Sequence, residues 1–318
     1  MNKCFITKLP SSVDNDNLPV LGQLRINWLR QSNLANNDSR AIGLATNDSI
    51  VVKVSGAHLT DNTLASNLGN TKTITAADGL VWLYVSNDAD AILTIDNKYA
   101  LTQINVIRQD GEEYIERSIY FDIEDIRYCT NLTYISLLNT QVSGDISAVS
   151  KLTNLTQLSL LNTQVSGNIS AVSKLTNLIS LNLSDTQVSG DIENLSGLTK
   201  LLDLTQLKGL TLTGDMSKIP ANILFISQIN RKVNTNFTWT AGGRQNATLL
   251  SMEGQIPFDT TSMDNMFIDQ ATCTVSPQAN NTYQKIIAVS GTRTSASDAA
   301  VAAIQNKGIT ITGVTKQA

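Results

Sequence analysis

The sequence is short of charged and aromatic residues. Only 16% of its 318 residues are charged, 23 Lys and Arg are outnumbered by 27 Asp and Glu, and aromatic residues make up 5%. Surfaces that bind nucleic acid or anionic membranes need clustered positive charge, which this composition does not favour. The sequence also contains no run of 18 apolar residues, which is about the length needed to cross a bilayer. We therefore expect no nucleic-acid partner and no insertion into a membrane.

Histidine and cysteine are scarce as well. The one histidine, His58, cannot build a multi-histidine metal site, and Cys4, Cys129 and Cys273 lie too far apart for a spaced zinc motif. An odd number of unclustered cysteines also argues against a disulfide framework. The sequence thus predicts no metal site and three free, mostly buried thiols.

Signatures of catalysis are also missing. There is no G-x-S-x-G turn, and residues 241–244 lack the spacing and the Lys-Ser/Thr ending of a P-loop. Neighbouring carboxylates such as Glu124 and Asp125 would point to opposite faces of a strand, so they do not form an acid/base pair. Residues 1–10 lack the apolar stretch of a secretion signal. We expect a protein that is not an enzyme, has no catalytic residues and no cofactor, and is made in a cytosol.

A repeat of 23 residues fills the middle of the chain. Thr-Gln-Val-Ser-Gly recurs at 140–144, 163–167 and 186–190, and a fourth copy has a one-residue insertion between Thr205 and Thr213. Each copy keeps seven aliphatic positions, which one isolated 23-residue unit could not bury by itself, so neighbouring copies must stack. In the first copy these positions are Leu132, Ile135, Leu137, Val142, Ile146, Val149 and Leu152.

The L-x-x-L-x-L opening of each copy resembles the leucine-rich-repeat family. The resemblance implies a solenoid whose short parallel strands line a concave face. Where that family has Asn in the turn after the strand, this chain has Thr140, Thr163 and Thr186, whose hydroxyls can still bond turn backbone groups. The glycines of the Val-Ser-Gly segments are expected at positive φ. Asn-x-Ser/Thr triplets inside the repeat are interpreted as a product of composition.

The regions on either side of the repeat have different sequence patterns. Short β-rich runs about ten residues apart predict strands at 50–54, 71–75, 80–85, 91–95 and 101–107, and an antiparallel β-sandwich. Residues 118–129 are expected to cover the first repeat. Near the C-terminus, a strand at 285–290, a helix at 295–307 and a strand at 309–314 are predicted, with Ser295 and Asp298 capping the helix and Gly308 ending it.

The expected fold class is α+β and mostly β, in four parts. An extended N-terminal anchor arm (1–30), for which an ordinary loop is the alternative, precedes a β-sandwich domain (31–122). The leucine-rich-repeat solenoid with its N-terminal cap (123–236) follows, and then a C-terminal insert and strand-helix-strand capping unit (237–318).

The leucine phase predicts which side chains line the concave face. Adjacent strands lie about 4.8 Å apart, so these side chains would form a small, neutral, partly apolar patch that suits a protein or glycan partner. Its three predicted columns are Tyr134, Gln157, Ser180 and Asp203; Ser136, Ser159, Asn182 and Thr205; and Leu138, Leu161, Ser184 and Leu207.

Several segments outside the repeat resemble fibre or appendage proteins of tailed phages of gut bacteria. They are residues 6–10, residues 61–69 and residues 290–298, together with the Asn- and Thr-rich repeat. The resemblance implies a homotrimeric virion protein whose N-terminal region attaches to virion proteins and whose repeat binds a host-surface protein or glycan. A bacterial cell-surface adhesin and an intracellular leucine-rich-repeat scaffold remain as alternatives.

Overall fold

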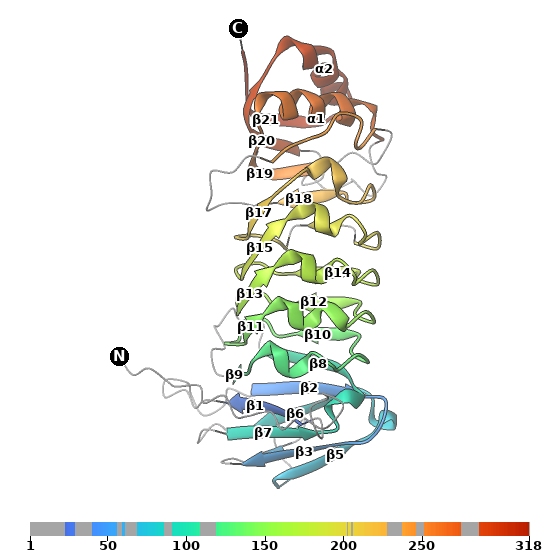
Figure 1. Cartoon of the computed structure of the whole chain (residues 1–318), viewed down its shortest axis with the longest axis vertical. Coiled ribbons are helices and arrows are strands. Elements are labelled where there is room, and N and C mark those ends of the chain that lie inside the picture. The colour runs from blue at the N-terminus through green and yellow to red at the C-terminus, as the bar shows by residue number, and fades with distance from the viewer. Residues whose placement is uncertain are drawn as a thin grey trace, which may run out of the picture.

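The computed structural model shows an elongated molecule in which short strands stack along the long axis (Figure 1). Most of the predicted anchor arm, together with Cys4 and His58, lies outside the described residues. The structure describes residues 23–28, 40–55, 59–60, 69–85, 91–108, 119–201, 203–204, 206–227, 237–245, 251–274 and 286–317.

Two sheets form the N-terminal end, and the strands predicted between 50 and 107 are all present. The first sheet is antiparallel, in the order β5-β3-β7-β1-β9, and alternate residues of β3 and β7 are buried. Four strands, β1, β2, β4 and β9, were not predicted. The bounds of the first sheet are β1 Leu24–Trp28, β3 Ile50–Ser55, β5 Thr71–Ile74, β7 Ala91–Asp96 and β9 Ile119–Tyr120. The antiparallel strands of the second sheet are β2 Arg40–Thr46, β4 Leu59–Thr60, β6 Val81–Val85 and β8 Leu101–Arg108.

Both N-terminal sheets continue into the repeat. Strand β8 pairs antiparallel with β2 and parallel with the first repeat strand, so one seven-stranded sheet contains both regions. On the other side, the Gln141 amide donates to the Ile119 carbonyl of β9 (2.8 Å), and Asp122 forms a parallel bridge with Ser143. The hydrophobic core is therefore continuous from the N-terminal sheets into the coils.

Each repeat forms one coil with two short strands and a 3-10 helix. All the aliphatic positions named for the first repeat are buried, as are their counterparts in the second and third. The first strands are β10 Tyr134–Ser136, β12 Gln157–Ser159 and β14 Ser180–Asn182, and the second strands are β11 Ser143–Asp145, β13 Gln164–Asn168, β15 Gln187–Asp191 and β17 Thr211–Thr213. The 3-10 helices are η3 Ile123–Ile126, η4 Ile146–Lys151, η5 Ile169–Val172, η6 Ile192–Leu195 and η7 Met216–Lys218.

The turn residues behave as expected from the sequence. The Thr163 hydroxyl donates to the Leu160 carbonyl at 2.8 Å, and Thr140 and Thr186 make the same bond in their own coils. Gly167 has φ of +107°, and an added Cβ would lie 2.7 Å from Oδ1 of Asp145 in the preceding coil. That oxygen accepts the Ser147 amide at the start of η4. The glycine thus leaves room for a helix-capping carboxylate, a reason that the sequence alone did not reveal.

The asparagines that follow the 3-10 helices, one of which begins an Asn-x-Thr triplet, bond to the preceding coil. Nδ2 of Asn154 donates to the Thr130 carbonyl (2.8 Å), and Nδ2 of Asn177 donates to the Thr153 carbonyl (3.0 Å). Each bond joins one coil to the coil before it. These asparagines therefore have a structural role, and the interpretation of the triplets as a product of composition stays a prediction.

The C-terminal region adds a parallel five-stranded sheet and two α-helices. The predicted strand at 285–290, helix at 295–307 and strand at 309–314 are present, whereas helix α1 was not predicted. The strands are β16 Asp203–Leu204, β18 Phe225–Ser227, β19 Ser251–Pro257, β20 Ile286–Arg293 and β21 Thr310–Lys316. The helices are α1 Thr260–Thr272, η9 Ser295–Ser297 and α2 Asp298–Asn306, and two short 3-10 helices near the N-terminus are η1 Ala76–Asp78 and η2 Lys98–Ala100.

The capping of the last helix differs from the prediction. Thr294, not Ser295, accepts the Ala296 amide (3.1 Å) at the start of η9. Asp298 instead binds Arg293 and Lys316. Gly308 does follow the helix, with φ of +79°.

Buried polar groups hold the C-terminal region together. Arg244 is 2% exposed and donates to the carbonyls of residues 219, 220, 221 and 223 at 2.7–3.3 Å. Burial lowers the pKa of its guanidinium to about 10, which leaves the group charged at neutral pH. Asp269 of α1 is fully buried and accepts Nε1 of Trp239 and the Gly242 amide, both at 2.9 Å. These bonds fasten residues 237–245 to the coil before them and to the helix after them.

Two of the three cysteines lie in the described part of the chain. Cys129 and Cys273 are both buried, as predicted, and Sγ of Cys273 donates to the Arg244 carbonyl at 3.0 Å. Burial raises the pKa of the Cys129 thiol to about 12. This thiol is protonated at neutral pH and packs as a small apolar side chain.

Candidate binding surface

The first strands of the repeats pair in parallel without a shift in register. Tyr134 pairs with Gln157, and Gln157 with Ser180, so the first predicted column is a row of adjacent residues. Ser159 and Asn182 pair in the second column. Asp203 begins β16, but its side chain lies outside the described part of the structure.

The exposure of these side chains varies along the rows. Gln157 is exposed, whereas Tyr134, Ser159, Ser180 and Asn182 are half-buried. Leu138 and Leu161, in the third column, are half-buried too. A partner at this surface would therefore meet amide and hydroxyl groups beside part of two leucines and a tyrosine.

Ser136 was predicted to face a partner, but only 3% of it is exposed. In its row, Ser136 lies between Asn105 of β8 and Ser159 of β12, and Ser159, at the equivalent position of the next coil, is half-buried. Ser136 is therefore removed from the candidate surface.

The end of the third column was also predicted wrongly. Leu207 is fully buried, because the one-residue insertion falls before it, whereas the predicted column counted 23 residues from Ser184 to Leu207. The Leu183 amide donates to Gln206, and the Asp185 amide to Lys208, so Lys208 takes the position after Ser184. Ser184 is 6% exposed and accepts the Lys208 amide (3.2 Å), which places this serine within the turn.

The rows extend beyond the repeat in both directions. In β8, Gln103 pairs with Tyr134 and Asn105 pairs with Ser136. In β18, Phe225 pairs with Asp203 and is half-buried. The sequence analysis missed Gln103 and Asn105 because it treated the N-terminal strands as a separate domain, and the pairing of β8 with β10 reveals them. The pairing of β16 with β18 reveals Phe225.

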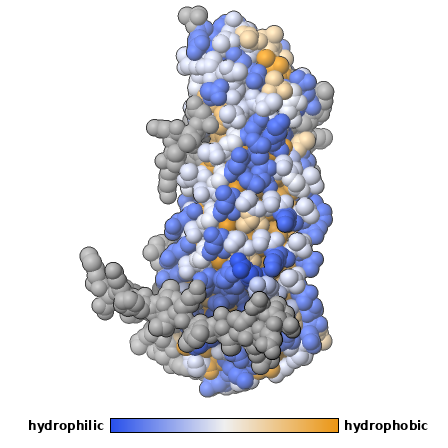
Figure 2. Space-filling view, viewed as in Figure 1, coloured by the Kyte–Doolittle hydropathy of each residue, from blue (hydrophilic) through white to orange (hydrophobic). Residues whose placement is uncertain are grey.

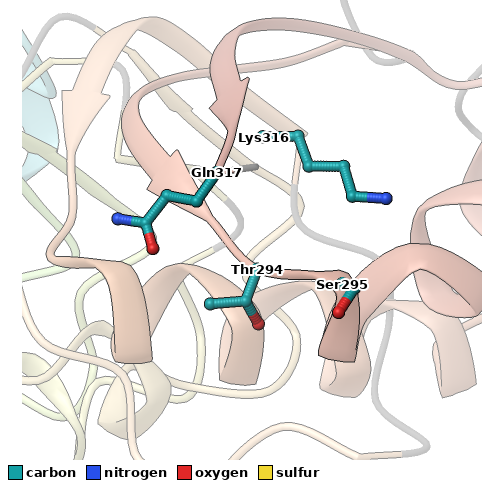
Figure 3. Close-up of a pocket in the computed structure, with 4 residues that line it drawn as sticks. All are labelled: Thr294, Ser295, Lys316 and Gln317. Atoms are coloured by element: carbon teal, nitrogen blue, oxygen red, sulfur yellow. The ribbon is translucent and has the colours of Figure 1, made fainter.

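One hollow lies elsewhere, at the start of η9 and the end of β21. It has a volume of about 470 Å³ and is lined by Thr294, Ser295, Lys316 and Gln317 (Figure 3). Asp298 holds Nζ of Lys316 at 2.5 Å and Nη1 of Arg293 at 2.6 Å, and these bonds lower the pKa of the Asp298 carboxyl. The Asp298 carboxylate thus bonds to both cations beside the hollow.

The part of the chain that the structure describes contains neither a cluster of metal ligands nor a helix that could span a membrane. Within those ranges, no group of three or more His, Cys, Asp or Glu side chains could hold a metal ion. No described helix is both long and apolar enough to cross a membrane. The surface that Figure 2 shows along the coils is largely hydrophilic, with a small apolar patch at the end formed by the C-terminal helices.

Comparisons with known proteins place this chain near plant leucine-rich-repeat receptors. No family model matches the chain, and no curated protein does. The Arabidopsis thaliana receptor kinase SOBIR1 ectodomain has 25% identity and a TM-score of 0.31, and the match covers 48% of this chain and 73% of SOBIR1. The PEPR1–AtPEP1 structure has 15% identity and a TM-score of 0.41, with 68% of this chain and 35% of that chain covered.

A plant peptide hormone receptor, RGFR1 in complex with RGF2, gives a similar result. It has 15% identity and a TM-score of 0.38, with 62% of this chain covered. This chain spans about a third of the length of RGFR1, since the match covers 34% of that chain. All these TM-scores are below 0.5, so the leucine-rich-repeat-like, mostly β fold is argued from the pairing and burial of this chain's own coils.

Proposed function

We propose that this protein is a non-enzymatic virion fibre or appendage that attaches to a host-surface protein or glycan through the concave face of its repeat. The observation that carries this proposal is the in-register row of neutral side chains, Tyr134, Gln157 and Ser180. The N-terminal sheets are proposed to form a sandwich that covers one end of a leucine-rich-repeat solenoid, and the last strand-helix-strand unit to cover the other.

The size of the row favours a glycan or a short peptide segment. Six strands from β8 to β18, each about 4.8 Å from the next, give a length of about 24 Å. Three alternate positions along a strand give a width of about 14 Å, and hence an area of roughly 340 Å². A standard protein–protein interface buries about 800 Å² on each partner. The face is therefore small for a globular partner and suitable for a few sugar units.

The chemistry of the row agrees with such a ligand. Amide and hydroxyl groups can both donate and accept hydrogen bonds, as sugar hydroxyls do. The partly exposed Leu138, Leu161 and Tyr134 offer apolar surface beside them. Attachment to a virion rests on the resemblance of residues 6–10, 61–69 and 290–298 to phage appendage proteins.

The binding experiment compares two pairs of substitutions in the intact protein. One variant, Tyr134→Glu with Gln157→Arg, changes the concave face. Its control, Gln164→Arg with Gln187→Glu, places the same charges at two exposed glutamines of β13 and β15. Fluorescently labelled proteins are applied to gut-bacterial cells, and the amount retained is measured by flow cytometry.

We expect the concave-face variant to lose at least about tenfold in apparent affinity, the equivalent of about 1.4 kcal/mol, while the control binds as the unchanged protein does. Both variants should keep the melting temperature within a few degrees. Equal retention of the two variants would contradict the assignment of the concave face.

The virion assignment has its own experiment. Purified phage particles are labelled with an antibody against residues 131–190 and imaged by electron microscopy. Label on the appendages supports the assignment, and its absence contradicts it. Light scattering provides a second measurement, in which a trimer is expected and a monomer would contradict the fibre arrangement.

A further inference from the structure

Charge is unevenly distributed around the coils. Between Asp145 and Asp185 the only charged residues of the sequence are Lys151 and Lys174. Both lie at or just after the end of a 3-10 helix, on the edge of the coils that leads into the concave strands. Lys200 lies on the same edge of the next coil, and all three lysines are exposed.

The lysines are close together because they occupy neighbouring coils. Lys151 and Lys174 are separated by one repeat of 23 residues, and coils are about 4.8 Å apart. Nζ of Lys200 is 2.7 Å from Oδ1 of Asn177, which follows Lys174 by three residues. The backbone positions of the three lysines therefore span two coil spacings, roughly 10 Å along the edge.

Three of the four carboxylates of these coils, Asp145, Asp191 and Glu193, lie at the start or in the first turn of a 3-10 helix, and Asp185 lies in the turn after β14. Asp145 and Asp191 cap the starts of η4 and η6, at the ends of the second strands. Among the described residues, no ion pair forms between a carboxylate and Lys151, Lys174 or Lys200. The edge thus carries three cations that are not neutralised by neighbouring acids of the described chain.

Neutral polar groups lie between these cations on a fixed backbone. Each coil has an exposed threonine one or two residues away from its lysine in the sequence: Thr153, Thr176 and Thr199. The bonds from Asn154 and Asn177 to the preceding coils hold the same loops in place. At the N-terminal end of the edge, the ring of Tyr128 lies 5.1 Å from Nζ of Lys151.

We propose that this basic edge, defined by Lys151, Lys174 and Lys200, binds a linear acidic polysaccharide. The lysines would bind carboxylates of successive sugar units, and the threonine hydroxyls would bond to the sugar hydroxyls. Double-stranded DNA carries one charge per about 1.7 Å, or about six charges over 10 Å, so three cations would match about half of them. Charge alone therefore does not separate DNA from an acidic glycan, and the hydroxyls interleaved with the lysines favour the glycan.

The test uses two triple variants of the full chain with equal net charge. The edge variant is Lys151→Gln, Lys174→Gln and Lys200→Gln. The control variant removes the same charge elsewhere by Lys53→Gln, Lys72→Gln and Lys218→Gln. Binding is measured by affinity electrophoresis in gels that contain polygalacturonate, neutral dextran or single-stranded DNA, at low and at high salt, and folding is checked by thermal unfolding.

At low salt, we expect the unchanged protein and the control variant to bind polygalacturonate, and the edge variant to bind it at least about tenfold more weakly. At high salt, the binding of all three proteins should be at least about tenfold weaker than that of the unchanged protein at low salt. Dextran and DNA should not retard any of them. Four results would overturn the proposal: no binding by the unchanged protein, equal loss in both variants, DNA binding as tight as polygalacturonate binding, or equal retardation by dextran. Since the concave face is unchanged in the edge variant, its binding to cells reports separately on the proposed function.

Discussion

The three regular coils, residues 131–199, and the C-terminal coils, residues 203–317, are both built on parallel strands but are held together differently. In the regular coils the same bonds recur at the same positions. Turn threonines bond within their own coil, and asparagines bond to the coil before. The asparagine bond recurs once more in the C-terminal coils, from Asn222 to the Thr199 carbonyl. The other contacts that hold the C-terminal coils occur once each and are made by the buried side chains of Arg244, Asp264 and Asp269.

This difference shows two ways of stacking coils. Repeated bonds let one 23-residue pattern be copied, and each copy adds a similar increment of stability. Unique contacts allow longer loops and full α-helices, but each buried charge must then find its own partners. Removal of one such contact should therefore cost more than removal of one repeated bond.

The largest effect is expected at Arg244. Replacement Arg244→Met leaves buried backbone carbonyls without their donors, so we expect a loss of about 3–5 kcal/mol in the free energy of unfolding. Urea denaturation followed by circular dichroism measures it. The control, Arg127→Met, removes an exposed guanidinium that pairs with Glu124 and should cost about 0–1 kcal/mol. Similar losses in both variants would remove the distinction between the two regions.

The second-largest loss of stability is expected at a glycine of the regular coils. Gly167→Ala places a Cβ 2.7 Å from Oδ1 of Asp145 at a positive φ, so a loss of about 2–3 kcal/mol is expected. Gly197→Ala is the matched control, because its Cβ would lie 3.7 Å from the closest atom. There we expect no loss, or a gain of about 0.4–1 kcal/mol. Thermal unfolding of the two variants would show the difference, and equal melting temperatures would contradict it.

The turn threonines should matter less. Thr163→Val keeps the shape of a buried side chain but removes the bond to the Leu160 carbonyl, with an expected cost of about 1–2 kcal/mol. Thr176→Val changes an exposed threonine and should cost almost nothing. Because the fourth coil already has the buried Leu210 at the equivalent position, one missing turn bond is compatible with folding.

The smallest effect concerns the junction between the two regions. Asp215 accepts the Ser217 and Thr240 amides and the Thr240 hydroxyl. Burial works to raise the pKa of Asp215, but these bonds outweigh it, and the pKa lies below the ordinary value of 3.8. A carboxylate with a lowered pKa stabilises the fold above about pH 4, and this contribution is lost as the pH falls through the folded-state pKa.

The corresponding variant is Asp215→Asn. It should be about 1 kcal/mol less stable than the unchanged protein at pH 7, and the difference should shrink in acid. Urea denaturation between pH 3 and pH 7 measures this dependence. A difference that stays constant over the whole range would contradict the role assigned to the Asp215 charge.

Sequence reasoning succeeded where one pattern repeats. Seven aliphatic positions per copy were enough to place the core of the coils and the order of their faces, because stacking requires the same residues in each copy. It failed at α1, whose buried face contains Asp264, Asp269 and Gln270 beside its apolar residues. These polar residues are buried because distant parts of the chain bond to them, and no local pattern carries that information.

The candidate surface, too, was predicted correctly only where the repeat pattern determines it. The register of Tyr134, Gln157 and Ser180 follows from the repeat length alone. Ser136 is buried although Ser159 at the equivalent position is half-buried, and the position of Leu207 depends on where an inserted residue is accommodated. Neither could be read from the spacing of leucines.

The most direct measurement of the central claim is photo-crosslinking from the concave face to its partner. A benzophenone amino acid is introduced at Gln157 in one protein and at Gln164, on the second strand of the same coil, in another. Both are irradiated on gut-bacterial cells, and cross-linked products are detected after denaturing electrophoresis. The account predicts a cross-linked product from position 157 and none from position 164. A product from 164 alone, or equal products from both, would contradict it.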